Sequence, residues 1–522
     1  MRVGRLASCS VVLVVATLAL LVTSQPAAAE GTVGTGTPAS CTEAALDAAL
    51  AGGGTVTFNC GPIPVTITLT TQKEIGQTTI IDGKGLITLS GGGTTRHFFV
   101  MPDGNLSLIG LTLAHGAATN EIEGQGGAIF NHGGPTVSGC LFYSNEAPGS
   151  TAGAILNTAI ANISGSMFIE NDAGGGFAGA IANSGTMTIS DCDFNSNRGY
   201  YLGGAVTNTG TLSISGSDFS DNRSSTYGGA IGGRGSVMIV DTTFSGNIGA
   251  IWMDEGTLDV SRTRFTGNTA SGDGGAIFTG GDLTVSHSTF SGNSAGSDGG
   301  AIFATGDVAV SDSTFSGNTA AEQAGGIYSS GTLAITGTTF MANSAVAGAG
   351  GGLYSTGGST VTVTNSTFSG NSAGTDGGGM VANGMGSVTN CTLYGNEAGG
   401  LVNGGVFAQL TMRNTILAGN EPYNCSGPIT SMGHNLESRD TCGLDANGDL
   451  VNRNPLLGPL ADNGGPTFTH ALLTGSPAIE HGSNEGCPTT DQRGVLRPLL
   501  RICDIGAYEF ELDLYVPMVL KH

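Results

Sequence analysis

Apolar and polar residues between 121 and 424 follow one pattern that recurs about every 25 residues. In each unit a Phe or Leu stands three residues before an Asn. A Val or Ile stands five residues before that Phe or Leu in nearly every unit, and Leu, Val or Met usually stands seven before it. Apolar residues separated by single polar residues are typical of a strand with one buried face. Twelve units align in this way, from Phe142 to Leu417.

The pattern predicts three short strands in each unit. In one unit the first strand covers residues 283–285, a bend follows at Ser286 and His287, and the second strand ends at Phe290. A preceding variant of Gly-Gly-Ala-Ile supplies the third strand. The turns are too short to hold helices, so the units are expected to stack as coils. The sequence therefore predicts an all-β, right-handed parallel β-helix with about 12 regular coils around a core of Phe, Val and Ile.

The repeated Asn is interpreted as a structural ladder. An Asn side chain can donate to the coil on one side, accept from the coil on the other, and adopt the left-handed conformation that turns use. Residues that recur in every coil hold the coils together, so function is expected where the repeat is broken.

Five segments are expected along the chain. Residues 1–29 resemble a signal peptide, because Arg2 and Arg5 precede an apolar run and three alanines. Residues 30–120 form an N-terminal cap and irregular coils, with a capping box from Ser40 to Glu43 that predicts a short helix over about 41–51. Regular coils cover 121–424, a C-terminal domain covers 425–510, and residues 511–522 form an apolar tail, either a last strand or a sorting signal.

The charge of the chain bears on its partners. The formal charge is −23, and loss of Arg2 and Arg5 with no acidic residue would take it to −25. Such a surface repels nucleic acid and anionic membranes, and it repels acidic polysaccharides unless a cation bridges them. After the signal no stretch is long and apolar enough to span a membrane. The expected location is secreted or at the cell surface.

Nine cysteines follow the signal, and they divide into two groups. Three pairs lie close in sequence outside the regular coils and suit disulfides in an oxidising exterior: Cys41 with Cys60, Cys425 with Cys442, and Cys487 with Cys503. Cys140, Cys192 and Cys391 occupy an inward position two residues before the repeated aromatic or leucine, and we expect buried free thiols there.

Two resemblances to known families rest on these motifs. Gly274-Gly275-Ala276-Ile277 with Phe290-Ser291-Gly292-Asn293 resembles the repeats of polymorphic outer membrane proteins. That resemblance implies a right-handed β-helix of the pectin-lyase-like class and a surface-displayed, often adhesive role. Residues 454–510 resemble the choice-of-anchor Q domain, through Asn463-Gly464-Gly465, Asp491-Gln492-Arg493-Gly494 and Gly506-Ala507-Tyr508-Glu509. Proteins with that domain are typically secreted β-helices whose surface anchors vary.

Acidic residues on consecutive coils are the only candidates for a metal site. Asp273 and Asp298 share one position of the repeat, and Asp282 and Asp307 share another, so each pair is expected near 5 Å apart. Stacked carboxylates of this kind can hold Ca²⁺. The alternative is that each Asp stabilises a Gly-Asp or Asp-Gly turn through its own side chain. No other cofactor is expected.

Basic and aromatic residues give two candidate binding surfaces. Arg198 and Arg223 follow the ladder Asn on neighbouring coils, with Tyr201 and Tyr227 nearby, and such a cluster can hold an anionic sugar or form a solvated edge. The third strand offers the other surface. There Trp252, Phe278 and Phe303 occupy one outward position on consecutive coils, and the alignment places Ser329 next. The coil from Phe244 to Phe265 has only 21 residues, so neighbouring loops are expected to overhang a shallow notch at Trp252.

Two classes of function remain. The first is a non-catalytic adhesive or scaffolding rod that binds an extracellular polysaccharide or a surface partner. The second is a polysaccharide lyase or glycoside hydrolase, which would need convergent carboxylates or acids with a basic residue. Regular coils with small loops leave little room for a walled active site, so the binding rod is favoured and no catalytic residue is assigned.

Overall fold

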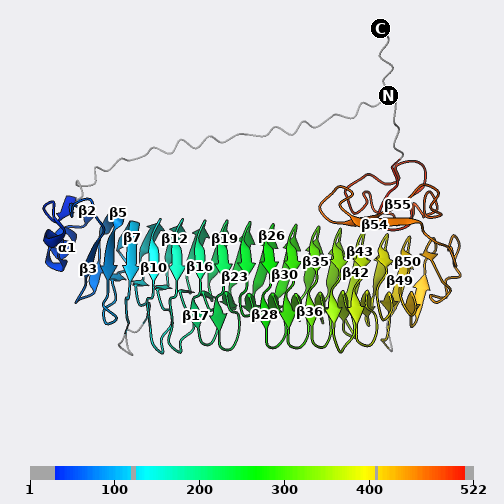
Figure 1. The fold of residues 1–522 in the computed structure, drawn as a ribbon, viewed down its shortest axis with the longest axis horizontal. Coiled ribbons are helices and arrows are strands. Elements are labelled where there is room, and N and C mark those ends of the chain that lie inside the picture. The colour runs from blue at the N-terminus through cyan, green and yellow to red at the C-terminus, as the bar shows by residue number, and fades with distance from the viewer. Residues whose placement is uncertain (1–29, 119–124, 406–408, 512–522) are drawn as a thin grey trace, which may run out of the picture.

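The computed structural model describes residues 30–118, 125–405 and 409–511, which form a long rod of stacked coils (Figure 1). Most coils place two strands in a broad sheet of 31 strands and one strand in a narrow sheet of 15 strands. Short sheets of two and five strands lie between them along part of the rod. Strands of successive coils pair in parallel, as β26 with β30 and β29 with β33 do. The predicted parallel β-helix is confirmed.

One coil shows how the repeat folds. Strand β26 (Thr257–Ser261) is followed by a bend at Arg262, whose φ is 47°, and by β27 (Arg264–Thr266). The chain then enters β28 (Thr269–Ala270) and reaches the narrow sheet as β29 (Ile277–Thr279). In the next coil the bend falls at His287, between β30 (Asp282–Ser286) and β31 (Thr289–Ser291), where it was predicted.

The sheets have the following strands. The irregular first coils contribute β1 (Glu30–Val33), β2 (Gly54–Phe58), β3 (Val65–Thr68), β5 (Thr78–Ser90) and β7 (Asn105–Ala114) to the broad sheet. The narrow sheet contains β4 (Lys73–Ile75), β6 (Phe98–Val100), β8 (Ile129–Asn131), β11 (Ile155–Asn157), β14 (Ile181–Asn183), β18 (Val206–Asn208), β22 (Ile231–Gly233), β25 (Ile251–Met253), β29, β33 (Ile302–Ala304), β37 (Ile327–Ser329), β41 (Leu353–Ser355), β45 (Met380–Ala382), β48 (Leu401–Val402) and β51 (Cys425–Ser426). The short sheets pair β17 (Arg198–Gly199) with β21 (Arg223–Ser224), and β28 with β32 (Ser294–Ala295), β36 (Thr319–Ala320), β40 (Ser344–Ala345) and β44 (Ser372–Ala373).

A stack of phenylalanines runs through the core. From Phe142 to Phe368 the repeated rings are fully buried, with neighbouring centroids 4.6–4.9 Å apart and ring planes within 11° of parallel. Each ring therefore covers the faces of the rings above and below it. A coil alone would leave these faces in water, which is why the coils are stable only as a stack.

The repeated Asn forms the expected hydrogen-bonded ladder, with one difference. Asn293 Nδ2 donates to Asn318 Oδ1 at 2.9 Å, and Asn293 Oδ1 accepts from Asn268 Nδ2 at 2.9 Å. The left-handed residue, however, is not the Asn. It is the residue before it, such as Gly292 at φ 61°, because that residue makes the turn while the Asn side chain points inward.

A short helix covers the N-terminal end of the rod. Helix α1 (Glu43–Leu50) packs its buried Leu46 against the first coils (Figure 1). The predicted capping box was wrong, because Thr42 is the N-cap and accepts from Ala45 N, while Ser40 Oγ donates to the Thr37 carbonyl. Among the described residues no helix has the length and apolarity that a membrane crossing requires. The predicted signal peptide lies outside the described residues.

The cysteines divide as expected. Disulfides join Cys41 with Cys60, Cys425 with Cys442 and Cys487 with Cys503. Cys140, Cys192 and Cys391 are free and buried. Burial raises the pKa of the Cys140 and Cys192 thiols to about 11 and that of Cys391 to about 12, so these side chains belong to the core.

The C-terminal segment folds back onto the rod. Coil stacking continues past residue 424 through β51, β52 (Ile429–Ser431) and β53 (Leu436–Glu437). The later residues include an antiparallel pair, β54 (Leu457–Ala461) and β55 (Thr469–Leu472), and lie against the side of the last coils (Figure 1). Most of the tail, residues 512–522, lies outside the described residues.

Candidate functional site

The coil that follows Phe244 departs from the repeat and is shorter than the coils on either side of it. Asn247 precedes the narrow-sheet residue Ile251 by four residues, whereas Asn268 precedes its counterpart Ile277 by nine. The loop that neighbouring coils carry before the narrow sheet is therefore missing here. Residues 224–227 of the preceding coil and 270–274 of the following coil border the gap.

A pocket of about 330 Å³ occupies this gap. Its size is at the lower end of the range for small-molecule sites. The apolar lining comes from Tyr227, Ile248, Trp252 and Phe278. Hydroxyl groups and one carboxylate complete it: Ser224, Ser225, Thr226, Ser271 and Asp273. The notch that the short coil predicts is thus present beside Trp252.

An aromatic row runs from this pocket along the outer face of the narrow sheet. Strand register places Trp252 against Phe278, Phe278 against Phe303, Phe303 against Tyr328 and Tyr328 against Tyr354. Tyr227 reaches over from the preceding loop and stacks on Trp252. We call these six residues the aromatic row. The five rings that come from strands are half-buried, and Tyr227 is exposed.

The rings of the aromatic row cover one another. Neighbouring centroids are 4.2–5.7 Å apart, and the planes deviate from parallel by 7–27°. Trp252, Phe278, Phe303 and Tyr328 therefore have another ring against both faces. A sugar ring prefers to stack on an aromatic face, so these four residues offer mainly their edges to a ligand.

Sequence reasoning found only part of the row. Ser329 was aligned with Phe303, but the structure places Tyr328 there, and the Ser329 side chain is buried on the inner side of the strand. Tyr354 was missed for the same reason. The signal was the residue directly after the first apolar residue of each third strand, in Gly-Gly-Ile-Tyr and Gly-Gly-Leu-Tyr.

Asp273 and Asp298 lie beside this row, each bonded to the next coil. Asp298 N donates to Asp273 Oδ1 at 3.1 Å, and Gln323 N donates to Asp298 Oδ1 at 2.7 Å. Burial raises the pKa of Asp298, and the charges of Asp273 and Glu322 raise it further. Burial also raises the pKa of Tyr328, with a contribution from Asp298. The carboxylates and the row therefore share one environment of negative potential.

Asp282 and Asp307 form a second stacked pair. Asp307 N lies 3.4 Å from Asp282 Oδ1, and Thr332 N donates to Asp307 Oδ1 at 2.9 Å. The side chains thus bond the backbone of the following coil rather than a local turn. Across the described ranges, His, Cys, Asp and Glu form no group of three or more placed to hold a metal ion. Each Asp pair alone offers few ligands for Ca²⁺, which takes six to eight oxygens.

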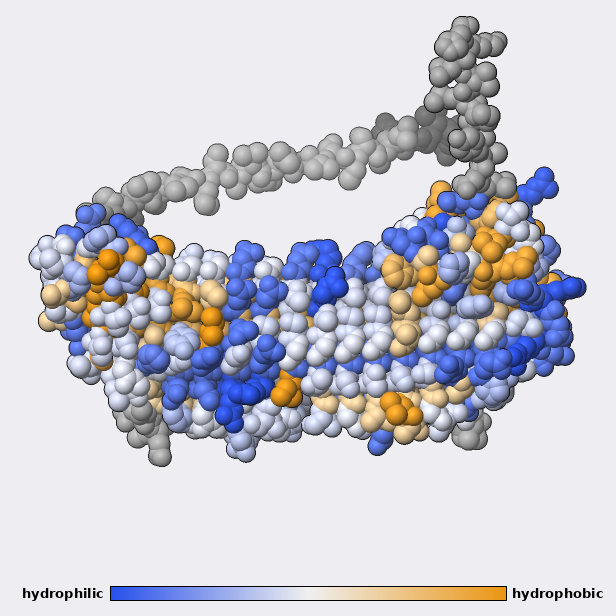
Figure 2. Space-filling model, in the orientation of Figure 1, coloured by the Kyte–Doolittle hydropathy of each residue, from blue (hydrophilic) through white to orange (hydrophobic). Residues whose placement is uncertain are grey.

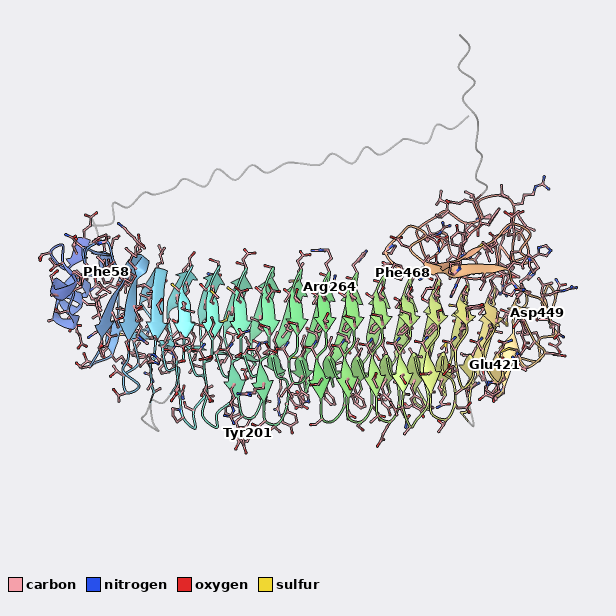
Figure 3. All side chains as sticks on the ribbon, viewed as in Figure 1. Phe58, Tyr201, Arg264, Glu421, Asp449 and Phe468 are labelled. Carbon is pink, nitrogen blue, oxygen red and sulfur yellow. A yellow bond between two sulfur atoms is a disulfide. The ribbon has the colours of Figure 1, made fainter. Side chains whose placement is uncertain are left out.

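The predicted Arg and Tyr cluster divides into two parts. Arg198 and Arg223 face each other across β17 and β21, and Arg198 lies 4.0 Å from Asp172. Tyr201 packs on Phe177 at the outer edge of the loops (Figure 3). Tyr227, by contrast, belongs to the aromatic row. Arg198 lines a separate shallow pocket of about 330 Å³ with Asp172 and Tyr200.

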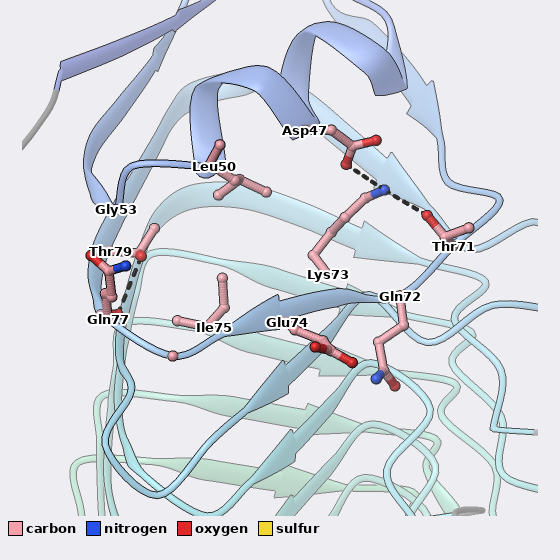
Figure 4. A pocket seen from close by; sticks show the side chains of 12 residues that line it. Asp47, Leu50, Gly53, Thr71, Gln72, Lys73, Glu74, Ile75, Gln77 and Thr79 are labelled. Atoms are coloured by element: carbon pink, nitrogen blue, oxygen red, sulfur yellow. Dashed lines mark hydrogen bonds and ion pairs between the residues drawn. The ribbon is translucent and has the colours of Figure 1, made fainter.

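A larger pocket of about 480 Å³ lies under helix α1 (Figure 4). Its buried Lys73 Nζ contacts Glu43 Oε1 at 2.7 Å, Asp47 Oδ1 at 2.6 Å and Thr71 Oγ1 at 3.0 Å. Burial opposes ionisation of Glu43, but hydrogen bonds from Lys73, Thr70 and Thr71 lower its pKa to about 2. The lysine is thus committed to ion pairs that hold the helix on the first coils.

Comparison with known proteins identifies the fold. A family model described as a right-handed β-helix region matches residues 180–320, 227–398 and 300–455. Together the matches span 180–455, which is more than half of the 522-residue chain. They include the short coil and the whole aromatic row. No curated protein matches the chain.

Proposed function

Because the chain belongs to the family of right-handed β-helix proteins, we propose that it is an extracellular rod that binds a carbohydrate or another surface partner without chemical conversion. The observation that carries this proposal is the pocket at the short coil. It lies where one coil, between two neighbours with longer loops, lacks its outer loop, and it combines an apolar lining with hydroxyl groups and one carboxylate. Small-molecule sites are built in this way, from an apolar wall and a few polar groups that fix orientation.

We also propose that the rod catalyses no reaction, and the hydrogen bonds of its stacked carboxylates support this part of the proposal. Asp273, Asp298 and Asp307 each accept a hydrogen bond from a backbone N–H of the next coil. Glycoside hydrolysis needs two carboxyl groups placed across one scissile bond. The stacked pairs instead point along the rod. A lyase would further need a basic residue, and only Asp273 among the pocket-lining residues is charged.

An extracellular location is proposed on three grounds. The three disulfides suit an oxidising compartment. The resemblance of residues 1–29 to a signal peptide, and of the repeats and C-terminal segment to surface-protein families, points the same way. On the face shown in Figure 2, the uncovered middle coils carry rows of residues with intermediate hydropathy beside hydrophilic patches, which is a surface suited to contact with water.

Binding and turnover can be measured together. Residues 30–522 would be purified and mixed with a panel of plant and microbial polysaccharides, with and without Ca²⁺. We expect cosedimentation with at least one polysaccharide and no release of reducing or unsaturated ends. Release of such ends would overturn the non-catalytic proposal in favour of a lyase or hydrolase.

Two matched variants locate the site. Trp252→Leu removes a pocket aromatic, whereas Phe303→Leu removes a ring of the same row that does not line the pocket. Both lose similar stacking, so their stabilities should be similar. We expect binding to fall about tenfold or more in Trp252→Leu, a loss of about 1.4 kcal/mol, and to be retained in Phe303→Leu. An equal loss in both variants would place the binding surface elsewhere.

A further inference from the structure

We infer that the pocket beside Trp252 recognises a saccharide bearing a protonated amine, that is, an amino sugar without its acetyl group. This inference rests on the proposed function and names the ligand class of the same site. It follows from which groups at the pocket are free to interact and from the sign of their charge.

Neighbouring rings already cover both faces of Trp252 before a ligand binds. Trp252 lies between Tyr227, 4.2 Å away, and Phe278, 5.7 Å away, with ring planes nearly parallel to both. A sugar ring cannot lie flat on a face that another ring already covers. Trp252 and Phe278 therefore supply apolar contact at their edges, one face of Tyr227 can still take a sugar ring, and the polar lining decides which sugar binds.

The polar lining has a single charged group, and it is negative. Asp273 is half-buried, and its Oδ1 accepts from Asp298 N at 3.1 Å, while its Oδ2 has no hydrogen-bond partner among the described residues. None of the ion pairs in the described part of the chain involves Asp273, Asp298 or Glu322. Arg223 is adjacent in sequence to Ser224, but its side chain is exposed and does not line the pocket.

The negative potential extends beyond one residue. Asp298 follows Asp273 on the next coil, and Glu322 belongs to the loop of the coil after that. Burial raises the pKa of Asp298, a hydrogen bond from Gln323 N lowers it, and the charges of Asp273 and Glu322 raise it, so the neighbouring carboxylates oppose the negative charge of Asp298. A cation placed beside them relieves both the repulsion and the cost of a partly buried carboxylate.

An ammonium group satisfies this site better than a neutral hydroxyl does. A hydroxyl donates a hydrogen bond to Asp273 Oδ2 in which only the acceptor is charged, whereas an ammonium donates a hydrogen bond and adds the attraction between two opposite charges. The hydroxyls of Ser224, Ser225, Thr226 and Ser271 can then contact the remaining sugar hydroxyls. An acidic sugar would be repelled by the same carboxylates.

The test compares two oligosaccharides that differ only in acetylation. Residues 30–522 would be titrated calorimetrically with a glucosamine hexamer and with the N-acetylglucosamine hexamer, at one pH and one ionic strength. We expect the amine form to bind at least tenfold more tightly. Asp273→Asn keeps the Oδ1 acceptor and removes the charge, so it should abolish this preference.

The control is Asp282→Asn, which makes the same change on an exposed stacked Asp outside the pocket. We expect it to retain the preference. An equal loss in Asp282→Asn, or equal binding of the two hexamers by the unaltered chain, overturns the inference while leaving the proposed carbohydrate site in place. Failure of both hexamers to bind, with another polysaccharide cosedimenting in the earlier panel, also overturns the inference but not the proposed function.

Discussion

The side-chain oxygen and nitrogen of each ladder Asn are fully hydrogen-bonded inside the rod. Asn293 Oδ1 accepts from Asn268 N and Asn268 Nδ2, and Asn293 Nδ2 donates to Asn318 Oδ1 and the Phe265 carbonyl. All of these groups are shielded from water, so no solvent molecule can replace a lost bond. The ladder therefore sets a strict requirement on one residue of every coil.

Replacing one ladder Asn should be costly. Asn293→Ala leaves two donors of Asn268, one acceptor of Asn318 and the Phe265 carbonyl without this partner. We expect the free energy of unfolding to fall by about 3 kcal/mol or more, because each buried polar group left unpaired costs about 1–3 kcal/mol. Guanidinium unfolding followed by circular dichroism measures the change. As a control, Asn195→Ala removes a half-buried Asn that bonds Ser220 Oγ, and its effect should stay below about 1 kcal/mol. Similar losses in both would contradict the role given to the ladder.

The repeat in the sequence predicted some single residues of each coil but not others. The inward Phe and Asn were found because they recur in every coil. The left-handed residue before each Asn was not, since Ser144, Glu170, Ala342 and several glycines share that conformation without sharing a side chain. Tyr328 and Tyr354 escaped because an outward position accepts many residue types, so no constant residue marks its register.

Among the larger elements, the C-terminal segment was the least predictable in its placement. Gln492 Nε2 donates to Thr339 Oγ1, and Gln492 Oε1 accepts from Thr367 Oγ1. Asn390 Nδ2 donates to the Asp504 carbonyl, and Asn414 Nδ2 to that of Ser483. The coils thus form contacts with residues about 70–150 positions away in sequence. Strands follow from local periodicity, but such distant pairings leave no periodic signal.

Asp504 should favour the docked segment at mildly acidic pH. Burial raises the pKa of Asp504 from 3.8 to about 6, against hydrogen bonds from Glu480 N and Phe510 N that lower it. The charge of Glu509 raises it further, and that of Arg497 lowers it. Between these two values the folded segment holds a proton that the unfolded chain has lost, so the stability that this proton confers is lost as pH rises toward 7. Lowering the pH from 7 to 5 should therefore add about 1 kcal/mol of stability through Asp504. Burial lowers the pKa of His470 in the same segment, so His470 acts in the opposite direction over this range. Hydrogen exchange of residues 454–511 measures this change.

The corresponding control removes the titrating group. Asp504→Asn cannot take up the proton, so the exchange rates of its C-terminal segment, corrected for intrinsic pH effects, should depend less on pH than those of the unaltered chain. The same pH dependence in Asp504→Asn and in the unaltered chain would contradict the assignment, since His470 is present in both.

Along the described residues the molecule is a rod of stacked coils, and a gap left by one short coil lies beside the aromatic row. The coil with the missing loop still places Phe244 between Phe219 and Phe265, and Asn247 between Asn222 and Asn268. The core ladders therefore pass through the gap unbroken. The pocket can therefore be changed without loss of stability. Stability depends on the inner positions of the coils, whereas the pocket depends on the length of one outer loop.

Filling the gap tests this separation directly. Inserting five residues with the sequence of 270–274 between Ile248 and Gly249 would give the short coil the same nine-residue spacing as its neighbour. The new loop would continue the stack of neighbouring loops and occupy the pocket beside Trp252. We expect the circular dichroism spectrum and the unfolding midpoint to change little, since surface loops tolerate added residues and every core residue is kept.

Carbohydrate binding should fall at least tenfold after this insertion. The same insertion between Val346 and Ala347, two exposed loop residues of a coil that does not line the pocket, should leave binding intact. Retained binding after the first insertion would show that the gap is not the binding site, whereas loss after both insertions would show that binding depends on the regular stack as a whole.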